Sequence, residues 1–207
     1  MIFSQEEASF FLNPEPMILR QEIIKKLDGL LADVQTKLKS TLKEHNFVFP
    51  EDTDIERGKI SRGENYQGLP WMMLDFPRLF SRDDTLVCRT FCWWGNTFAA
   101  HLLISGGILP AALENLVRQE RKKSALSISV CANPWKHHYE KQYYLKLRDF
   151  SDEGLAGLVS KTEYLKLSAW FPLNKAEELP ELVVGFFSEA CNLTGLLSLN
   201  SQPSQGI

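Results

Sequence analysis

The residues best suited to bind a ligand lie between positions 57 and 82. Arginines alternate there with carboxylates and aromatic side chains, through a turn-rich stretch that reads GENYQGLP. Guanidinium groups bind carboxylates or phosphates through paired hydrogen bonds, and aromatic rings line many small-molecule pockets. The same residue types also fasten irregular loops to a sheet, and the sequence favours this structural interpretation. If a ligand site exists, the pattern predicts that it is formed by Arg57, Arg62, Glu64, Tyr66, Trp71, Asp75 and Arg78.

A second candidate is the segment NPWKHHYEK, which carries His137, His138 and Glu140. A histidine and a carboxylate three residues apart can share one face of a helix and bind a metal ion, with the adjacent histidine as a base. However, the segment follows Asn133-Pro134 and joins two predicted strands, so a loop is favoured over a helix. A third ligand would have to come from a distant part of the chain. We therefore predict no metal site.

Nucleophile–base chemistry has one candidate, His101 with the cysteines at positions 88 and 92. Residues four apart on a strand are separated by roughly 13 Å, so the two cysteines cannot form a metal-binding or redox pair. A hydrogen-bonded structural histidine is the favoured interpretation. Gly106 and Gly107 resemble an anion-binding turn, yet a connection between a strand and a helix explains them. No hydrolase, metalloprotease, P-loop or dinucleotide-binding motif occurs, so no catalytic residue and no cofactor is predicted.

Composition narrows the class of protein. The chain has 207 residues, of which 44% are hydrophobic and 24% charged, as in an ordinary globular protein. Its net charge of −3 lacks the basic excess of a nucleic-acid-binding domain, so no nucleic-acid partner is expected. No stretch approaches the roughly 18 to 20 apolar residues that cross a bilayer, and the start, MIFSQEEASFF, is acidic where a secretory signal is basic. The four cysteines show no C-x-x-C spacing, which suits reduced thiols. We therefore expect a cytoplasmic protein without membrane contact.

A long amphipathic helix is predicted over residues 15–45, because apolar residues recur there at steps of three and four. Asn13 suits the N-cap position, ahead of two prolines in the first turn. The apolar residues of this helix are Ile23, Leu27, Leu30, Leu31, Val34, Leu38 and Leu42. Shorter helices are predicted at residues 4–11, 110–123 and 175–192, and residues 152–159 should form a short helix or a turn.

A hairpin is the clearest local element, with strands at residues 86–94 and 98–105. Gly95-Asn96 favours a two-residue turn, which sets the pairing of the strands. In that register Arg89 faces Leu102. One face of the hairpin is then strongly apolar and the other is mixed, as in a sheet covered on one side.

Further strands are predicted where apolar and polar residues alternate. They cover residues 59–62, 71–76, 125–132, 143–149 and 163–171, and Pro77 should end the second of them. Short connections favour antiparallel neighbours. We therefore predict an α+β protein with a mostly antiparallel sheet of about five to six strands, helices packed on one face, and the long N-terminal helix in front. One domain should cover residues 1–197, including an N-terminal helical segment at 1–46, and a flexible C-terminal tail should follow at 198–207.

The succession RGENYQGLPWMMLDFPRLF followed by CWWGNTF resembles a family of bacterial proteins to which no activity is attached. The likeness covers residues 57–104 and transfers no catalytic residue. It implies that this run is the distinctive part of the family.

Two functions are compatible with these patterns. The first is a non-enzymatic binding or interaction domain, because no nucleophile–base or metal set is evident, while the hairpin is rich in aromatic residues and the N-terminal helix is long. That helix could pack against a protein partner or a second subunit, so self-association as a homodimer is one expectation. The alternative is an enzyme that binds a carboxylate or phosphate through residues 57–82.

Overall fold

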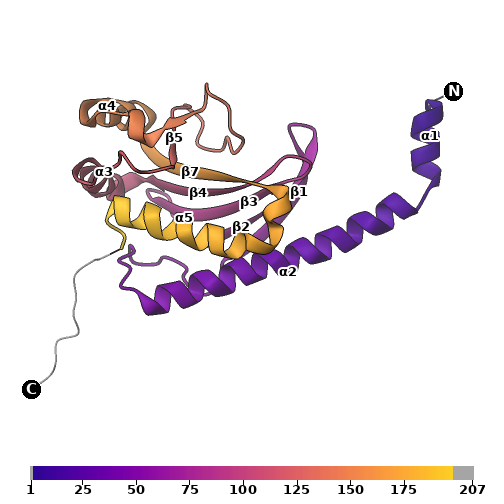
Figure 1. Ribbon diagram of the computed structural model, residues 1–207, viewed down its shortest axis with the longest axis horizontal. Coiled ribbons are helices and arrows are strands. Elements are labelled where there is room, and N and C mark those ends of the chain that lie inside the picture. Colours follow the sequence, from indigo (N-terminus) through magenta and orange to yellow (C-terminus); the bar gives the residue numbers. More distant parts are fainter. Residues whose placement is uncertain (1, 198–207) are drawn as a thin grey trace, which may run out of the picture.

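The structure, a computed structural model, describes residues 2–197. Its seven strands form one sheet in the order β1-β2-β3-β4-β7-β5-β6, and all neighbours are antiparallel (Figure 1). The strands are β1 (Lys59–Tyr66), β2 (Leu69–Phe80), β3 (Thr85–Trp93), β4 (Thr97–Ser105), β5 (Ser127–Ser129), β6 (Tyr144–Lys146) and β7 (Tyr164–Pro172). The helices are α1 (Gln5–Leu12), α2 (Glu15–Glu44), α3 (Leu109–Arg118), α4 (Asp152–Thr162) and α5 (Leu179–Thr194), with the short 3-10 helices η1 (Gly106–Ile108), η2 (Leu147–Asp149) and η3 (Leu173–Glu178).

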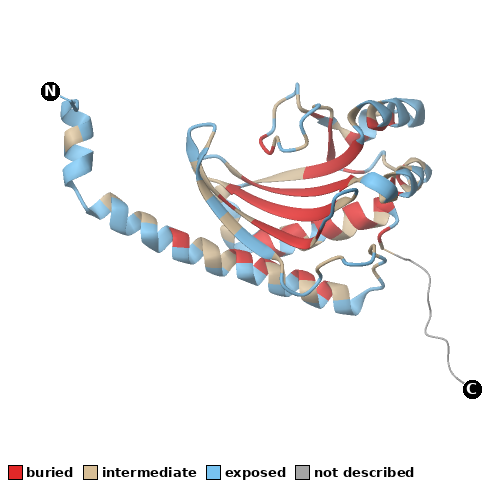
Figure 2. Cartoon of the chain, turned by 180° about the vertical axis from the view of Figure 1, so that it is seen from behind, coloured by how far each residue is buried: buried red, intermediate tan, exposed pale blue. Residues whose placement is uncertain are grey.

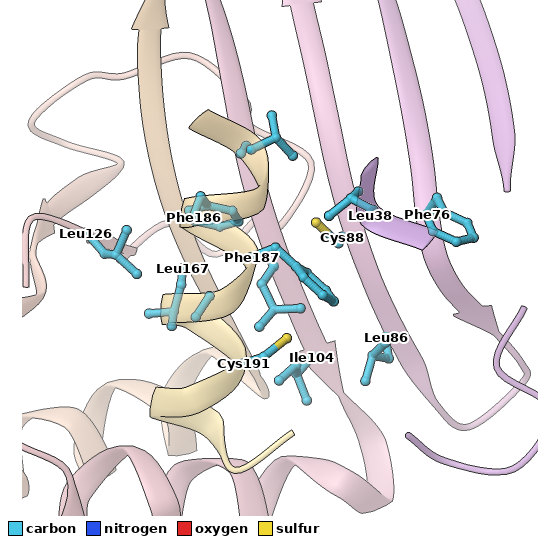
Figure 3. Close-up of a cluster of buried hydrophobic side chains, with 14 of the residues drawn as sticks. Leu38, Phe76, Leu86, Cys88, Ile104, Leu126, Leu167, Phe186, Phe187 and Cys191 are labelled. Atoms are coloured by element: carbon cyan, nitrogen blue, oxygen red, sulfur yellow. The ribbon is translucent and has the colours of Figure 1, made fainter. Parts of the chain in front are cut away.

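Helices α2 and α5 pack side by side across one face of the sheet (Figure 1). Figure 3 shows the centre of this layer, where Phe187 and Cys191 of α5 lie among Ile104 of β4 and Cys88 of β3. Helices α3 and α4 close one end of the sheet (Figure 1). The predicted α+β class, with an antiparallel sheet and a long N-terminal helix, is confirmed. The sheet has seven strands instead of five to six, because even the three-residue strands β5 and β6 join it.

The long helix α2 forms where the sequence predicts it, and α1 differs from its predicted bounds by one residue. The N-cap is Pro14 and not Asn13, contrary to the prediction, although Asn13 Oδ1 still accepts a hydrogen bond from the N–H of Glu15 at 3.0 Å. The buried apolar residues of α2 lie on one side, at steps of three, four and seven, as an amphipathic helix requires. They are Ile24, Leu31, Val34 and Leu38.

The hairpin of β3 and β4 forms as predicted, but in a different register. Its turn is three residues long, 94–96, instead of two. Only Gly95 adopts a positive φ there, +70°, whereas the predicted kind of turn needs two such residues. Arg89 therefore lies opposite His101, and not opposite Leu102. Since successive residues of a strand point to opposite faces, this shift of one residue exchanges the two faces of β4.

Strand β2 does not end at Pro77, contrary to the prediction, and continues for three more residues. The peptide bond before Pro77 is cis, and the pairing with β3 shifts register between Asp75 and Arg78. A bulge of this kind accommodates a proline, because a bulged residue needs no N–H for the sheet. Strand β1 likewise extends beyond the predicted residues 59–62, as far as Tyr66.

Other elements differ from prediction mainly at their ends. Strands β5 and β6 are shorter than predicted, whereas α4 is a full helix where the sequence predicts a short helix or a turn. Helix α3 stops at Arg118, and η3 replaces the first turn of the predicted last helix. The predicted tail at 198–207 lies outside the described residues. None of the helices in the described part of the chain is long and apolar enough to cross a membrane.

Candidate functional site

A row of polar side chains crosses the sheet on the face that α2 and α5 leave open. Residues directly opposite each other in neighbouring strands point to the same face, so a polar residue in register on every strand makes a continuous strip. All members of the strip are buried except the lysines at its two ends. The strip, called the polar row below, consists of Lys59, Asp75, Arg89, His101, Ser168, Ser127 and Lys146, from β1 to β6.

Residues 131–143, called the cover loop below, close over the polar row. A side chain from the sheet holds the backbone of this loop. Lys166 Nζ donates to the carbonyl oxygen of Pro134 at 2.7 Å and to that of Lys136 at 2.6 Å. Tyr144 also donates its hydroxyl to the Lys136 carbonyl. The loop is thus fixed through its own carbonyl groups.

His137 is the loop residue that reaches furthest into the polar row. Its N–H donates to Tyr66 Oη at 2.7 Å, and its carbonyl accepts from Trp170 Nε1 at 2.9 Å. Its ring Nε2 lies 3.1 Å from Arg89 Nη1. Arg89 in turn binds Asp75 through two hydrogen bonds of 2.7 and 2.8 Å. The charge of the arginine is therefore neutralised inside the protein, as a buried ion pair requires.

The hydrogen-bonding capacity of these groups fixes the protonation of His137. Arg89 Nη1 can only donate, so Nε2 of His137 accepts and carries no hydrogen. The hydrogen of the neutral ring is then on Nδ1, which lies 3.4 Å from Lys166 Nζ. The Nδ1–H then points toward the lysine, which favours an uncharged amine because an ammonium group cannot accept a hydrogen bond. Burial, reinforced by the charge of Arg89, lowers the pKa of Lys166 well below that of an ordinary lysine.

His101 has one ring nitrogen without a partner. Its Nδ1 lies 2.8 Å from Ser168 Oγ, whereas no described residue offers Nε2 a hydrogen bond. The ring borders a gap beside Arg89 and Lys166 that is too narrow for a water molecule. Burial lowers the pKa of His101 well below its usual value. In this arrangement the polar row fastens the cover loop and leaves no room for a substrate.

The seven residues predicted to bind a ligand do not gather in one place. Asp75 belongs to the polar row, and Tyr66 lies beside it with its hydroxyl 2.8 Å from His138 Nδ1. Burial raises the pKa of Tyr66. Trp71 lies on the same face of the sheet and stacks on Phe91 at 6.1 Å between ring centroids. These three predicted residues are brought together.

The other four lie elsewhere. Arg62 is opposite Met72, a residue of the core beneath the helices, so it lies on the opposite face from Asp75. Glu64 lies on that same face and forms an ion pair with Arg20 of α2.

Arg57 and Arg78 are both bound by Asp54, in the loop before β1. Asp54 accepts a hydrogen bond from the backbone N–H of Arg57 at 2.8 Å and binds the side chain of Arg78 at 3.3 Å. Arg78 lies opposite Val87 and so shares the face of the polar row, where its side chain is engaged by Asp54.

Four central residues of this region were missing from the predicted ligand set. They are Arg89, His101, His137 and Lys166. The signal that identifies them is strand register: a three-residue turn in the hairpin places Arg89 opposite His101. The contribution of the cover loop has no comparable signal, because loop conformation depends on the surface below it.

The histidines and the carboxylate of the segment NPWKHHYEK point in different directions. His137 points into the sheet, whereas Glu140 is on the outside and lies 3.0 Å from His138 Nε2. Within residues 2–197 no group of three histidine, cysteine or acidic side chains is placed to hold a metal ion.

The cysteine and glycine candidates are occupied by the fold. Cys88 and Cys92 face the helices, on the opposite side of β3 from the face to which His101 belongs. Burial raises the pKa of Cys92 to about 12, so this thiol is not ionised at neutral pH. The N–H of Gly107 donates to Asp84 Oδ1 at 2.6 Å. A carboxylate of the chain itself therefore fills the position that an anion would take.

A second candidate region is the helical arm, residues 2–23, which projects past the edge of the sheet (Figure 1). No side chain of the arm is buried, and Figure 2 shows it as mostly exposed. Arg20 anchors its base by binding Glu64 and by lying 5.8 Å from the ring of Trp94. Nine large apolar side chains of the arm are 37–94% exposed: Ile2, Phe3, Phe10, Phe11, Leu12, Met17, Ile18, Leu19 and Ile23.

A groove begins where the arm ends. It runs between α2 and the start of α5 and has a volume of about 560 Å³. Its floor is largely apolar, with charged residues at its rim. Its lining includes Ile23, Lys26, Leu27, Gly29 and Leu30 of α2, and Ala176 and Pro180 on the opposite side.

No protein-family model matches the chain, and no curated protein and no solved structure is significantly similar to it. The resemblance of residues 57–104 to a bacterial family stays a prediction. The function is therefore inferred from the contacts and exposure of the side chains.

Proposed function

We propose that this protein is a non-enzymatic interaction domain that binds a partner through its helical arm. The observation that carries the proposal is the exposure of nine large apolar side chains between residues 2 and 23. They present on the order of 1,000 Å² at about 150–250 Å² for a large side chain. A monomeric protein rarely exposes an apolar patch of more than about 300–600 Å², and larger patches mark interaction sites.

The stability of α1 supports the same proposal. This helix has 8 residues, and isolated helices shorter than about 12–15 residues are marginal in water. Ser4 and Glu7 form a capping box at its start, which contributes only about 1 kcal/mol. A second surface packed against Phe10, Phe11 and Leu12 would supply the missing stabilisation.

The remainder of the chain acts as a scaffold in this proposal. From Ile24 onward α2 belongs to the core, and it holds the arm at a fixed angle to the sheet. The net charge of −3 supports a protein partner over a nucleic acid or an anionic membrane. The four cysteines are free thiols, which supports a cytoplasmic location.

Photocrosslinking in the cells that naturally make the protein tests the proposal. A photoreactive phenylalanine analogue in place of Phe11, which is 73% exposed, should give a covalent product with a defined partner. The same analogue in place of Phe80, which is 46% exposed at the far end of β2, should not. Replacing Leu12 and Leu19 by glutamate should abolish the first product while leaving the fold intact. If position 11 gives no more product than position 80, the arm has no partner.

The alternative function, an enzyme that binds a carboxylate or phosphate through residues 57–82, has less support. Asp75 and Arg62 are on opposite faces of the sheet, and Arg78 is engaged by Asp54. A rise in melting temperature with acetate or inorganic phosphate, lost in Arg62→Ala, would favour it over the interaction domain.

A further inference from the structure

We propose that the partner of the arm is a second copy of this chain, with two α2 helices crossing antiparallel so that each arm lies in the groove of the other copy. The inference rests on the proposed function, because it names the partner of the same arm. Arm and groove are parts of one continuous helix. Leu19 and Leu30 are about 16 Å apart along it, at 1.5 Å per residue. The arm therefore cannot reach the groove of its own chain, and a second molecule must fill it.

One apolar stripe runs from the arm into the groove. Leu19, Ile23, Leu27 and Leu30 recur at steps of four, four and three residues, so they share one side of α2. If two such helices cross antiparallel near residues 24–25, Leu19 of each copy meets Leu30 of the other. Ile23 then meets Leu27. A two-fold axis makes the two halves of this contact identical, as in most homodimers.

The area of the arm is sufficient for a stable dimer. Its exposed apolar side chains present on the order of 1,000 Å² per copy. A standard specific interface buries about 800 Å² of each partner. The arm therefore exposes apolar surface of the size that such an interface buries.

Gly29 permits the close approach that such a crossing needs. It lies exposed in the middle of α2, on the wall of the groove. A Cβ atom added there would meet no atom of the described residues within 4 Å, so packing inside the chain does not require glycine. Glycine weakens a helix interior relative to alanine. Its missing side chain leaves room for Ile18 and Leu19 of the second copy.

The charges beside the stripe are complementary in the same arrangement. Glu22 and Lys26 lie on either side of the crossing point and on one flank of α2. The two-fold axis brings Glu22 of each copy toward Lys26 of the other. Two ion pairs then form across the interface and favour the antiparallel orientation.

Sedimentation equilibrium of the full chain tests the dimer. The wild type should be dimeric, and Gly29→Leu should raise the dissociation constant by roughly 5- to 150-fold, since the leucine side chain overpacks a tight contact. Gly157→Leu is the matched control. Gly157 is an exposed glycine of α4 that also has no atom within 4 Å of an added Cβ, so this variant should stay dimeric. Circular dichroism checks that both variants are folded.

A charge exchange provides an independent test that does not depend on Gly29. Lys26→Glu should raise the dissociation constant about fivefold, because two weak ion pairs are lost and replaced by repulsion. Adding Glu22→Lys to the same chain should restore the wild-type value, since the pairs re-form with their signs reversed. Random surface effects would not give this recovery.

The outcomes separate the two proposals. A wild type that stays monomeric at its highest soluble concentration overturns the second-copy inference, and so does a dimer that neither Gly29→Leu nor Lys26→Glu weakens. A crosslink from position 11 to a different protein would leave the interaction function standing without the dimer. The absence of any position-specific crosslink would remove both.

Discussion

Lys166 Nζ of β7 lies 3.4 Å from Nδ1 of His137 in the cover loop, and both residues are buried. Because His137 accepts from Arg89 through its other nitrogen, the lysine faces an N–H group and is uncharged. It donates to two loop carbonyls and accepts from the histidine. This pair joins the loop to the sheet without burying an unpaired charge, whose cost would be several kcal/mol.

Replacing Lys166 by methionine should change the way that stability depends on pH. The native lysine is neutral at a pH where the unfolded chain, with an ordinary pKa of 10.5, is protonated. The unfolded state therefore binds one more proton, and stability should rise with pH by up to about 1.4 kcal/mol per pH unit. This contribution is complete above the unfolded pKa and is lost as the pH falls. Denaturant titrations between about pH 7 and 9 should show a steeper rise for the wild type than for Lys166→Met.

Other groups oppose this trend without obscuring it. Burial raises the pKa values of Cys88 and Tyr144, so the unfolded state releases their protons first at alkaline pH. Both proteins contain these groups, and the difference between the two curves isolates Lys166. Parallel curves would mean that the native lysine is charged.

Acid should destabilise the protein through His137. Burial, with the charge of Arg89, lowers the pKa of this histidine well below 6.5 in the native state. The unfolded chain therefore takes up the extra proton as the pH falls below 6.5, so stability is complete above that value and declines below it. The decline between about pH 6.5 and 5 should be smaller in His137→Gln than in the wild type. His45→Gln, at the exposed end of α2, should follow the wild type.

Breaking the buried ion pair should be strongly destabilising. Asp75→Asn leaves the charge of Arg89 buried without its carboxylate, which costs about 3–5 kcal/mol in comparable cases. Glu114→Gln removes an exposed ion pair with Arg118 and should cost no more than about 0.5 kcal/mol. Urea denaturation of the two variants measures both values. Equal losses would contradict the burial of the first pair.

Two glycines with positive φ should respond differently to alanine. At Gly106, with φ +83°, an added Cβ would collide with the carbonyl oxygen of Asp83, so Gly106→Ala should cost about 3 kcal/mol. At Gly95, with φ +70°, the added Cβ would meet no described atom within 4 Å, so Gly95→Ala should cost about 1 kcal/mol. Thermal unfolding compares them. A larger loss of stability at Gly95 than at Gly106 would contradict the open conformation of the turn at 94–96.

Local patterns predicted the elements far better than their relationships. The period of apolar residues is a property of the chain alone, so the long helix, the hairpin and the α+β class were all predicted. The prediction that Pro77 ends its strand was wrong. Proline is tolerated in a strand at a bulge, and the position of a bulge depends on the pairing with the neighbouring strand.

The candidate site depends on the register between β3 and β4, where a shift of one residue decides which side chains are opposite each other. A two-residue turn would place Arg89 opposite Leu102, whereas the three-residue turn places it opposite His101 and completes the polar row. Periodicity gives the two faces of each strand, but it does not say which faces of two strands coincide. That choice belongs to the whole sheet, where packing against α2 and α5 decides which face is apolar.

The sequence by itself determined the class of fold, the long helix with its apolar stripe, and the absence of known catalytic motifs. Only the tertiary structure decided where the helix is covered: α2 has buried residues from Ile24 onward, while the arm before it has none. Likewise, only the structure placed His137 and Lys166 together, although 29 residues separate them in the chain. The physical reason is that periodicity reports which side of an element is apolar, whereas burial and contact depend on which other elements reach it.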